Sequence, residues 1–256
     1  MGDMSEWPGA VPEVLAEVDA GTARIVATLE ELSDEDMRAP SALPGWTRGH
    51  VATHIARNAD SLWNLLEWAR TGVRIPQYPS MEARNAALEE GAGRGAKELV
   101  RDVRETAERF SMQAASLPPE AREVTVEAMA GFSHPAWYTV YRRWHEVEAH
   151  HADLAAGYGP ARWPAAYVQW ALPATLADLE ALPEGLRGGL NGHRLLATET
   201  GDAADLGGGA GAPRICGSGR AMLGWLTGRS SGEGLVRRPE GPLPVPPPWP
   251  QAPARF

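Results

Sequence analysis

The stretch TRGHVATHIARNADSLWNLLEWARTG, residues 47–72, indicates the architecture of the N-terminal half of the chain. Its apolar residues recur at three-to-four spacing, the period of an amphipathic helix: Val51, Ile55, Leu62 and Leu66. Thr47 is of a residue type that caps helix N-termini, and Gly72 suits a helix end. The stretch therefore predicts one long helix that begins after Thr47 and ends near Gly72.

Three further stretches indicate helices around this one. The same apolar period runs over residues 14–32 and 99–110, and a fourth helix is predicted to begin at SHPAW, with Ser133 as N-cap and Pro135 in the first turn, and to reach about Ala156. Residues 74–85, RIPQYPSMEARN, indicate a proline-containing connection, and EVTVEA, residues 123–128, a strand or hairpin. Four long helices predict a four-helix bundle over residues 1–160.

The character of the chain changes beyond Pro160. One more helix is expected over residues 164–182, followed by the strand-like segments HRLLATET and PRICGS and a helix capped by Ser218. The tail RRPEGPLPVPPPWP, residues 237–250, holds too many prolines for a helix or a central strand, so we expect it to be extended. Residues 161–256 thus form a small α/β domain with a proline-rich tail, and the whole chain is of the α+β class.

Composition narrows the function. The net charge of −9 over 256 residues argues against nucleic acid or an anionic membrane as partner and favours small molecules. The single cysteine, Cys216, allows no internal disulfide and no thiolate-rich metal site. No apolar run approaches the roughly 20 residues that span a bilayer, and MGDMSEWPGAVPEVL at the start is acidic where a signal peptide is basic. We therefore expect a cytoplasmic protein, and a monomer.

A candidate metal site lies in WHEVEAHHADL, residues 144–154. Glu146 and His150 stand four residues apart, so on a helix they project from one face and can share an ion. His54 lies on the core flank of its own helix and can face them, as in bundles that hold metals between helices. The competing interpretation is a hydrogen-bonded core histidine. The segment HEVEAH is not the zinc-protease motif H-E-x-x-H, because it has one residue too many.

For other polar residues, the sequence predicts exposure and interaction partners. His50 is expected to face solvent, and Glu148 to pair with a basic side chain at the surface. Asp153, three residues after His150, can orient an imidazole or be an ordinary surface acid. Arg84 can meet a substrate carboxylate, although a solvated charge is the preferred interpretation, and Cys216 is expected to be buried.

Several motifs together resemble the mycothiol-dependent maleylpyruvate isomerases of actinobacteria. They are LPGWTRGHVATHIARNADSLWNLLEWARTG (43–72), YPSMEARN (78–85), RRWHEVEAHHADL (142–154), GWLTGR (224–229) and the ending PPPWP (246–250). The resemblance implies a DinB-like metal-binding four-helix bundle followed by a small α/β domain. It also implies a divalent metal, usually zinc, held by His54, Glu146 and His150, with mycothiol as thiol cofactor. Arg229 matches an arginine that this family carries on its C-terminal domain and is the expected catalytic residue.

The reaction that the resemblance implies is the cis-trans isomerisation of maleylpyruvate to fumarylpyruvate in gentisate degradation. A mycothiol thiolate adds to the cis double bond, the resulting single bond rotates, and the thiolate is eliminated. One alternative is a mycothiol S-transferase that leaves the thiol on another electrophile, in detoxification or secondary metabolism. A second is a metal-binding regulator without enzymatic activity, although such proteins usually recruit cysteine ligands and Cys216 lies outside the bundle.

Overall fold

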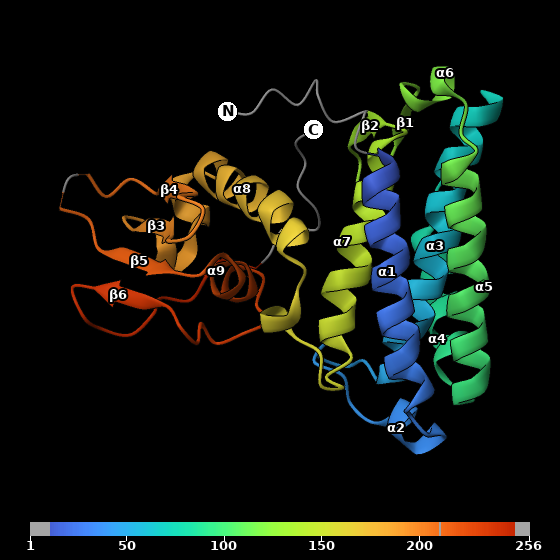
Figure 1. Ribbon diagram of the computed structural model, residues 1–256, viewed down its shortest axis with the longest axis horizontal. Coiled ribbons are helices and arrows are strands. Elements are labelled where there is room, and N and C mark those ends of the chain that lie inside the picture. The colour runs from blue at the N-terminus through green and yellow to red at the C-terminus, as the bar shows by residue number, and fades with distance from the viewer. Residues whose placement is uncertain (1–10, 210, 249–256) are drawn as a thin grey trace. The chain divides into compact units, whose positions relative to one another are not determined.

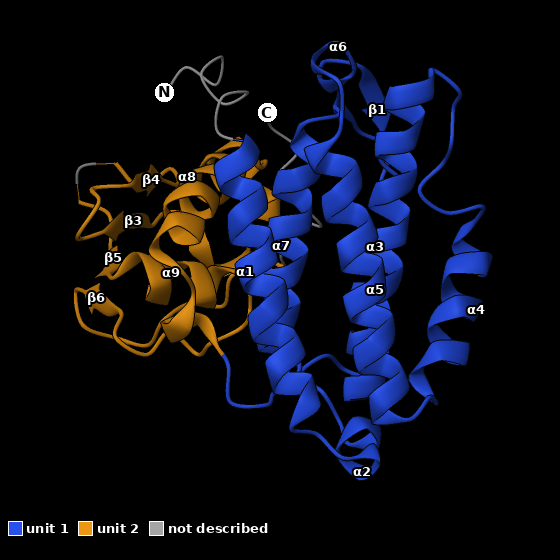
Figure 2. Ribbon diagram, turned by 45° about the vertical axis from the view of Figure 1, so that its right-hand side comes forward, with its two compact units in different colours: residues 1–158, 256 blue, residues 159–255 orange. Residues whose placement is uncertain are grey.

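The computed structural model describes residues 11–209 and 211–248, which form two compact units that divide after Tyr158 (Figures 1 and 2). The first unit is helical and the second combines helices with a small sheet. This confirms the predicted α+β class. The first ten residues, including most of the acidic N-terminal segment, lie outside the described part of the chain.

The first unit is built on four long helices. They are α1 (Val11–Glu30), α3 (Arg48–Thr71), α5 (Ala96–Ala115) and α7 (Tyr138–Asp153). α1 and α3 each pack against both α5 and α7, so the four helices form a closed ring around one apolar core. At its centre, fully buried residues come from three of the helices and include Ile25, Leu29, Val51, Ile55, Leu99 and Val103.

Helix α3 begins and ends where its sequence predicts. The Thr47 hydroxyl accepts a hydrogen bond from the backbone N–H of His50, and the His50 side chain accepts one from the Thr47 N–H, so both ends of a capping box are present. At the other end Gly72 takes the left-handed conformation, φ +72°, which a residue without Cβ adopts at little cost.

Shorter elements connect the long helices. They are α2 (Asp34–Arg38), α4 (Met81–Ala92), α6 (Pro119–Arg122), and the antiparallel hairpin of β1 (Thr125–Glu127) and β2 (Ser133–Pro135). The hairpin agrees with the strand-like EVTVEA.

Two predictions for this unit are wrong. The predicted connection over 74–85 contains the start of α4, which Ser80 caps; this helix is largely exposed and buries only Leu88, Gly91 and Ala92, so it has no apolar stripe to recognise. The predicted helix start at Ser133 is strand β2 instead, because residues 133–135 pair with β1, and α7 begins later, at Tyr138.

The second unit combines two helices with a four-stranded sheet. The helices are α8 (Ala165–Ala181) and α9 (Gly219–Leu226), and the strands are β3 (Arg194–Ala197), β4 (Ala203–Asp205), β5 (Arg214–Gly217) and β6 (Val236–Arg238). The strand order is β4-β3-β5-β6, with β3 and β5 parallel and the edge strands antiparallel. Three 3₁₀ turns complete it, at Pro160–Arg162, Glu184–Leu186 and Gly188–Leu190.

The sequence predicted the centre of this unit better than its edges. Ser218 caps α9 as expected, by accepting from the Ala221 N–H. The three-residue edge strands β4 and β6 are too short to show alternation, and Cys216 is half-buried rather than buried. Residues 242–248 of the tail form neither helix nor strand, as predicted, and its last residues are not among those described.

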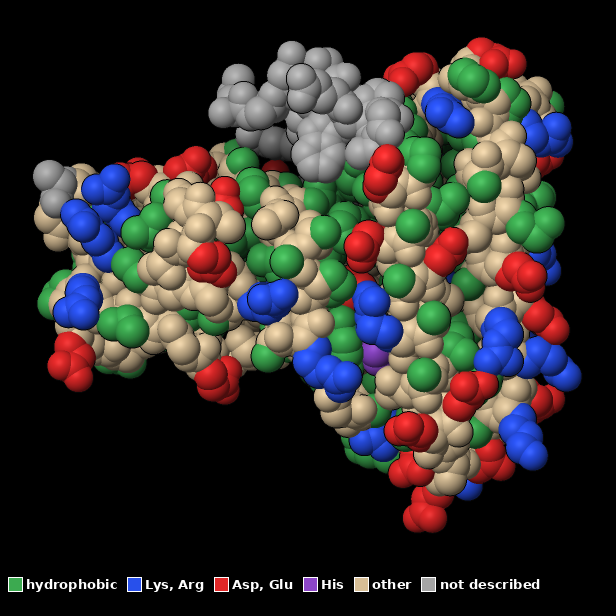
Figure 3. Space-filling model, viewed as in Figure 1, with side chains coloured by type: hydrophobic (Ala, Val, Ile, Leu, Met, Phe, Trp, Pro, Cys, Tyr) green, Lys and Arg blue, Asp and Glu red, His purple; other side chains and the backbone are tan. Residues whose placement is uncertain are grey.

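The surface is charged and mixed in sign. Figure 3 shows acidic and basic side chains interspersed over the visible face of the described chain. The described helices are each too short or too polar to span a bilayer.

Candidate metal centre

Three predicted ligands converge between α3 and α7. Nε2 of His54 lies 3.0 Å from Oε2 of Glu146 and 3.1 Å from Nε2 of His150. The third side of the triangle, from Nε2 of His150 to the same Glu146 oxygen, is 3.2 Å. Glu146 and His150 share a face of α7 because they stand one turn apart, and His54 meets them from the facing helix. We call these three residues the triad.

The triad has the dimensions of a metal site. Nitrogen and oxygen ligands about 2.0–2.2 Å from a tetrahedral zinc ion lie roughly 3.3–3.6 Å apart. The observed separations are only a few tenths of an ångström shorter, and the three side chains form a group that could hold a metal ion. Two imidazoles and one carboxylate suit zinc and similar divalent ions, and three protein ligands leave a coordination position for another molecule.

Asp153 orients one of the imidazoles. Its Oδ2 accepts a hydrogen bond from Nδ1 of His150 at 2.9 Å, and the Asp153 side chain is almost fully buried. With its proton on Nδ1, neutral His150 turns the lone pair of Nε2 toward the centre of the triad. The geometry agrees with the orienting role considered for Asp153 and not with a surface acid.

The triad favours an ionised carboxylate beside a neutral imidazole. Burial raises the pKa of Glu146, but hydrogen bonds from His150 and His54 outweigh it and hold that pKa well below its usual value. Burial, together with the charge of His150, lowers the pKa of His54. For His150 burial lowers the pKa, but the Asp153 and Glu146 carboxylates outweigh it and raise that pKa. A bound cation would displace the proton that His150 then carries.

Trp46 closes one side of the triad. The centroid of its ring lies 5.6 Å from that of His54 and 6.1 Å from that of His50. Trp46 is half-buried and also packs against the bundle core.

Two arginines next to the triad, Arg142 and Arg143, were not predicted from the sequence. Arg143 is fully buried and donates from Nη1 to the Ile55 carbonyl at 2.8 Å and to Oδ1 of Asn58 at 2.9 Å, so it ties α7 to α3. Burial lowers its pKa to about 10. Arg142 donates to Oε1 of Gln77 at 3.2 Å. A signal for Arg143 was present, since it stands four residues before the core residue Val147, at an apolar position of the helix.

Two polar residues differ from their predictions. Glu148 is fully buried, where it pairs with Arg24 at 2.5 Å and accepts from the Tyr158 hydroxyl at 2.6 Å, so its basic partner is as expected but its surface position is wrong. Burial raises the pKa of Glu148. His50 is half-buried because it caps α3, with Nε2 3.5 Å from Glu89.

Arg229 lies in the second unit, just beyond α9. Its Nη1 donates to the Thr227 carbonyl at 3.2 Å, and its N–H to the Gly224 carbonyl at 2.8 Å. These contacts place the side chain at the C-terminal end of the helix, where a cation also interacts favourably with the helix dipole. A catalytic role for Arg229 stays a prediction.

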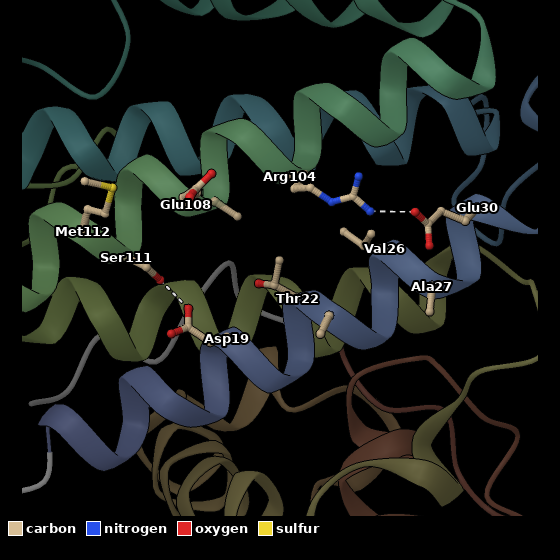
Figure 4. Close-up of a pocket in the computed structure, with 11 residues that line it drawn as sticks. Asp19, Thr22, Val26, Ala27, Glu30, Arg104, Glu108, Ser111 and Met112 are labelled. Carbon is tan, nitrogen blue, oxygen red and sulfur yellow. Dashed lines mark hydrogen bonds and ion pairs between the residues drawn. The ribbon is translucent and has the colours of Figure 1, made fainter.

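A hollow lies on the other side of the bundle, between α1 and α5. It encloses about 520 Å³ and is lined by apolar residues and by polar pairs at its ends, where Arg104 forms an ion pair with Glu30 and the Ser111 hydroxyl donates to Asp19 (Figure 4). No histidine or cysteine lines it. The side chains that could bind a metal therefore lie on the α3–α7 side of the bundle.

Residues 18–155, which include the whole triad, match the model of the mycothiol maleylpyruvate isomerase N-terminal domain. The chain belongs to this family of enzymes. The family membership confirms the resemblance inferred from the sequence motifs.

Solved structures extend the likeness of this isomerase-family protein beyond the matched domain. A crystal structure of the mycothiol-dependent maleylpyruvate isomerase superposes with a TM-score of 0.82 at 26% identity, covering 93% of this chain and 97% of the other. A histidine-to-alanine mutant of the mycothiol-dependent maleylpyruvate isomerase matches with the same values. No curated protein sequence gives a match.

Proposed function

We propose that this protein is a metal- and mycothiol-dependent isomerase that converts maleylpyruvate to fumarylpyruvate. The observation that carries the proposal is the triad itself: two imidazole nitrogens and one carboxylate oxygen within 3.2 Å of one another, in a chain of this family. We expect it to act as a monomer in the cytoplasm, in gentisate degradation.

The triad would hold a divalent ion, which we expect to be zinc. When bound, the ion supplies positive charge that lowers the pKa of the mycothiol thiol, so that at neutral pH a thiolate is available to add to the cis double bond and leave again after rotation. The protein contributes the three ligand atoms and keeps their side chains in the protonation states that bind a metal. Glu146 is held ionised, His54 is held neutral, and Asp153 keeps Nδ1 of His150 protonated so that its Nε2 faces the site.

Arg229 would stabilise the negative charge that develops on the substrate. Addition to a double bond conjugated with a carbonyl places charge on the carbonyl oxygen, and a guanidinium fork suits that oxygen or a carboxylate. We expect Arg229→Ala to leave metal binding unchanged and to cost about 2–4 kcal/mol of transition-state stabilisation. Arg229→Lys should recover only part of this, because a point charge lacks the fork.

The test is an assay of the purified protein on maleylpyruvate, with and without mycothiol. We expect fumarylpyruvate only when the thiol is present, and no turnover after treatment with a chelator. Isomerisation that needs no thiol would contradict the proposal, and so would a stable thiol adduct as the sole product, since that is the outcome of an S-transferase.

Circular dichroism of the chelated protein separates a catalytic ion from a structural one. The bundle buries a large apolar core of its own, so we expect its helical signal to survive removal of the ion, unlike that of a zinc finger. Loss of the helical signal on chelation would indicate that the ion holds the fold together.

A further inference from the structure

Helix α4 runs antiparallel to α3 and brings Arg84 close to the triad. Near the C-terminal end of α4, Gly91 lies so close to Thr53 that a Cβ there would be 2.3 Å from the threonine methyl group. Just before α4 begins, Tyr78 lies near the side chain of Ser61. Arg84 stands two turns before Gly91, about 10 Å along the helix. Arg84 therefore lies level with α3 residues about one to two turns beyond His54. Its charge contributes to the lowered pKa of His54.

The Arg84 guanidinium has no acidic partner. It lies over the Tyr78 ring, 5.8 Å from the centroid, and Nη1 donates to Oδ1 of Asn85 at 3.1 Å. Among the described residues no carboxylate oxygen comes within 4.0 Å of it. Many arginines of the same unit are paired, as Arg74 is with Glu127 and Arg94 with Asp102.

Arg142 adds a second cation on the same side of the triad. It precedes Glu146 by one helical turn, so both side chains project from one face of α7. Nη2 of Arg142 donates to Oε1 of Gln77, whose Nε2 in turn donates to Oγ of Ser61 at 3.3 Å. Like Arg84, Arg142 makes no ion pair with a carboxylate of the described chain.

These contacts link α3, α4 and α7 through one polar cluster, which we call the Arg84 cluster; its members are Ser61, Gln77, Tyr78, Arg84 and Arg142. The cluster carries two guanidinium groups and no carboxylate, in a chain whose net charge is −9. The ionised Glu146 carboxylate acts electrostatically on Arg142, whereas Arg84 has no carboxylate of the described chain within ion-pair distance. A partly buried cation without a counter-ion is costly, and an anion that enters from solvent would compensate it. Arginine over an aromatic ring, with a tyrosine hydroxyl beside it, matches the planar, acceptor-only shape of a carboxylate.

We propose that Arg84, supported by Tyr78 and by the charge of Arg142, binds a carboxylate of the substrate beside the triad. The assignment rests on the proposed function, because maleylpyruvate carries a carboxylate at each end and its double bond has to be held near the thiol. It replaces the solvated charge that the sequence favoured for Arg84. The carboxylate is bound within the helical unit, so this contact does not need the second unit.

Maleate is a suitable probe, since it has the cis double bond and two carboxylates but does not need to react. Its affinity for the metal-loaded protein is measured by calorimetry for the wild type, Arg84→Gln, Arg84→Lys and the control Arg74→Gln, an exposed arginine of the loop between α3 and α4. We expect Arg84→Gln to weaken maleate binding roughly 10-fold or more. Arg84→Lys should be intermediate, and Arg74→Gln should equal the wild type.

Metal content and kinetics distinguish this role from others. We expect Arg84→Gln to keep a full equivalent of metal and to raise KM for maleylpyruvate more than it lowers kcat. Undiminished maleate affinity in Arg84→Gln would overturn the assignment, as would a loss that comes with loss of metal. A wild type that binds maleate through Arg84 but does not isomerise maleylpyruvate would refute the proposed function and leave the carboxylate site standing.

Discussion

The α3–α7 side of the helical unit buries charged and polar groups, whereas the α1–α5 side leaves them in solvent. Around the triad, Arg143 and His134 are almost completely buried, and Glu146 is largely so. On the opposite side the ion pair of Arg104 with Glu30 is about half exposed at both ends, and it borders a hollow lined with small apolar residues (Figure 4).

This contrast indicates which side of the bundle is functional. An exposed ion pair costs little to form and contributes little to stability, so it carries no functional information. A buried charge with incomplete partners lowers stability, and such groups gather where binding or catalysis requires them. Nε and Nη2 of Arg143 are buried without a hydrogen-bond partner among the described residues. The hollow between α1 and α5 has no group of metal ligands, whereas the α3–α7 side has the triad.

The largest expected effect comes from the triad. His54→Ala should lose bound metal and all turnover, whereas His50→Ala, one helical turn away, should keep both, because His50 caps α3 and takes no part in the triad. Elemental analysis and the isomerase assay check this. A full equivalent of metal in His54→Ala would contradict the assignment of the triad, and with it the conclusion that the α3–α7 side is the metal-binding side.

Acid should destabilise the α3–α7 side through His134. Burial and the charge of Arg142 lower its pKa to about 4, and its Nδ1 donates to the Pro135 carbonyl at 2.9 Å. The unfolded chain takes up this proton near pH 6.5 and the folded chain only near pH 4. The unfolding free energy therefore falls as pH drops from 6.5 to 4, by up to about 3 kcal/mol from this group.

The measurement is urea unfolding at several pH values for the wild type and for His134→Gln. We expect the variant to lose less stability than the wild type between pH 6.5 and 4. NMR titration of the folded protein gives an independent check, and a His134 that titrates near pH 6.5 would contradict the expectation.

A smaller effect is expected from the residue behind the triad. Asp153→Asn keeps the shape of the side chain but loses the charge that orients and polarises His150, so metal affinity should fall roughly 10- to 100-fold. Asp60→Asn, an acid of α3 that pairs with Arg57 and Arg109, is the control and should bind metal normally. Competition with a chelator of known affinity measures both. Equal metal affinities in Asp153→Asn and Asp60→Asn would show that Asp153 does not support metal binding through His150.

The smallest effect compares two arginines directly. Arg143→Met should raise the unfolding free energy by about 1 kcal/mol, because it removes a buried charge whose Nε and Nη2 lack hydrogen-bond partners among the described residues. The same substitution of the exposed Arg104 should change it by less than about 0.5 kcal/mol. Urea denaturation gives both values. If Arg143→Met lowers the unfolding free energy more than Arg104→Met does, the buried guanidinium of Arg143 stabilises the fold, and the expectation is wrong.

Local patterns predicted much of this protein. The apolar period and its flanking caps located α3, and the four-residue spacing placed Glu146 and His150 on one face of α7. The pattern failed where elements are short or exposed: α4 buries too few residues to show a stripe, and residues 133–135 are a strand because β1 pairs with them. The buried positions of Glu148 and Arg143 also could not be predicted, because charged residues are ordinarily placed at the surface.

Features that depend on neighbours a few residues apart can be predicted from the sequence alone: the helix period, the caps and the shared face of two ligands. The contact of His54 with Glu146, 92 residues away, and the approach of Arg84 on α4 to the same place depend on tertiary packing. The physical reason is that hydrogen bonding and side-chain spacing within a helix are local, whereas the approach of two helices is set by how the whole core packs.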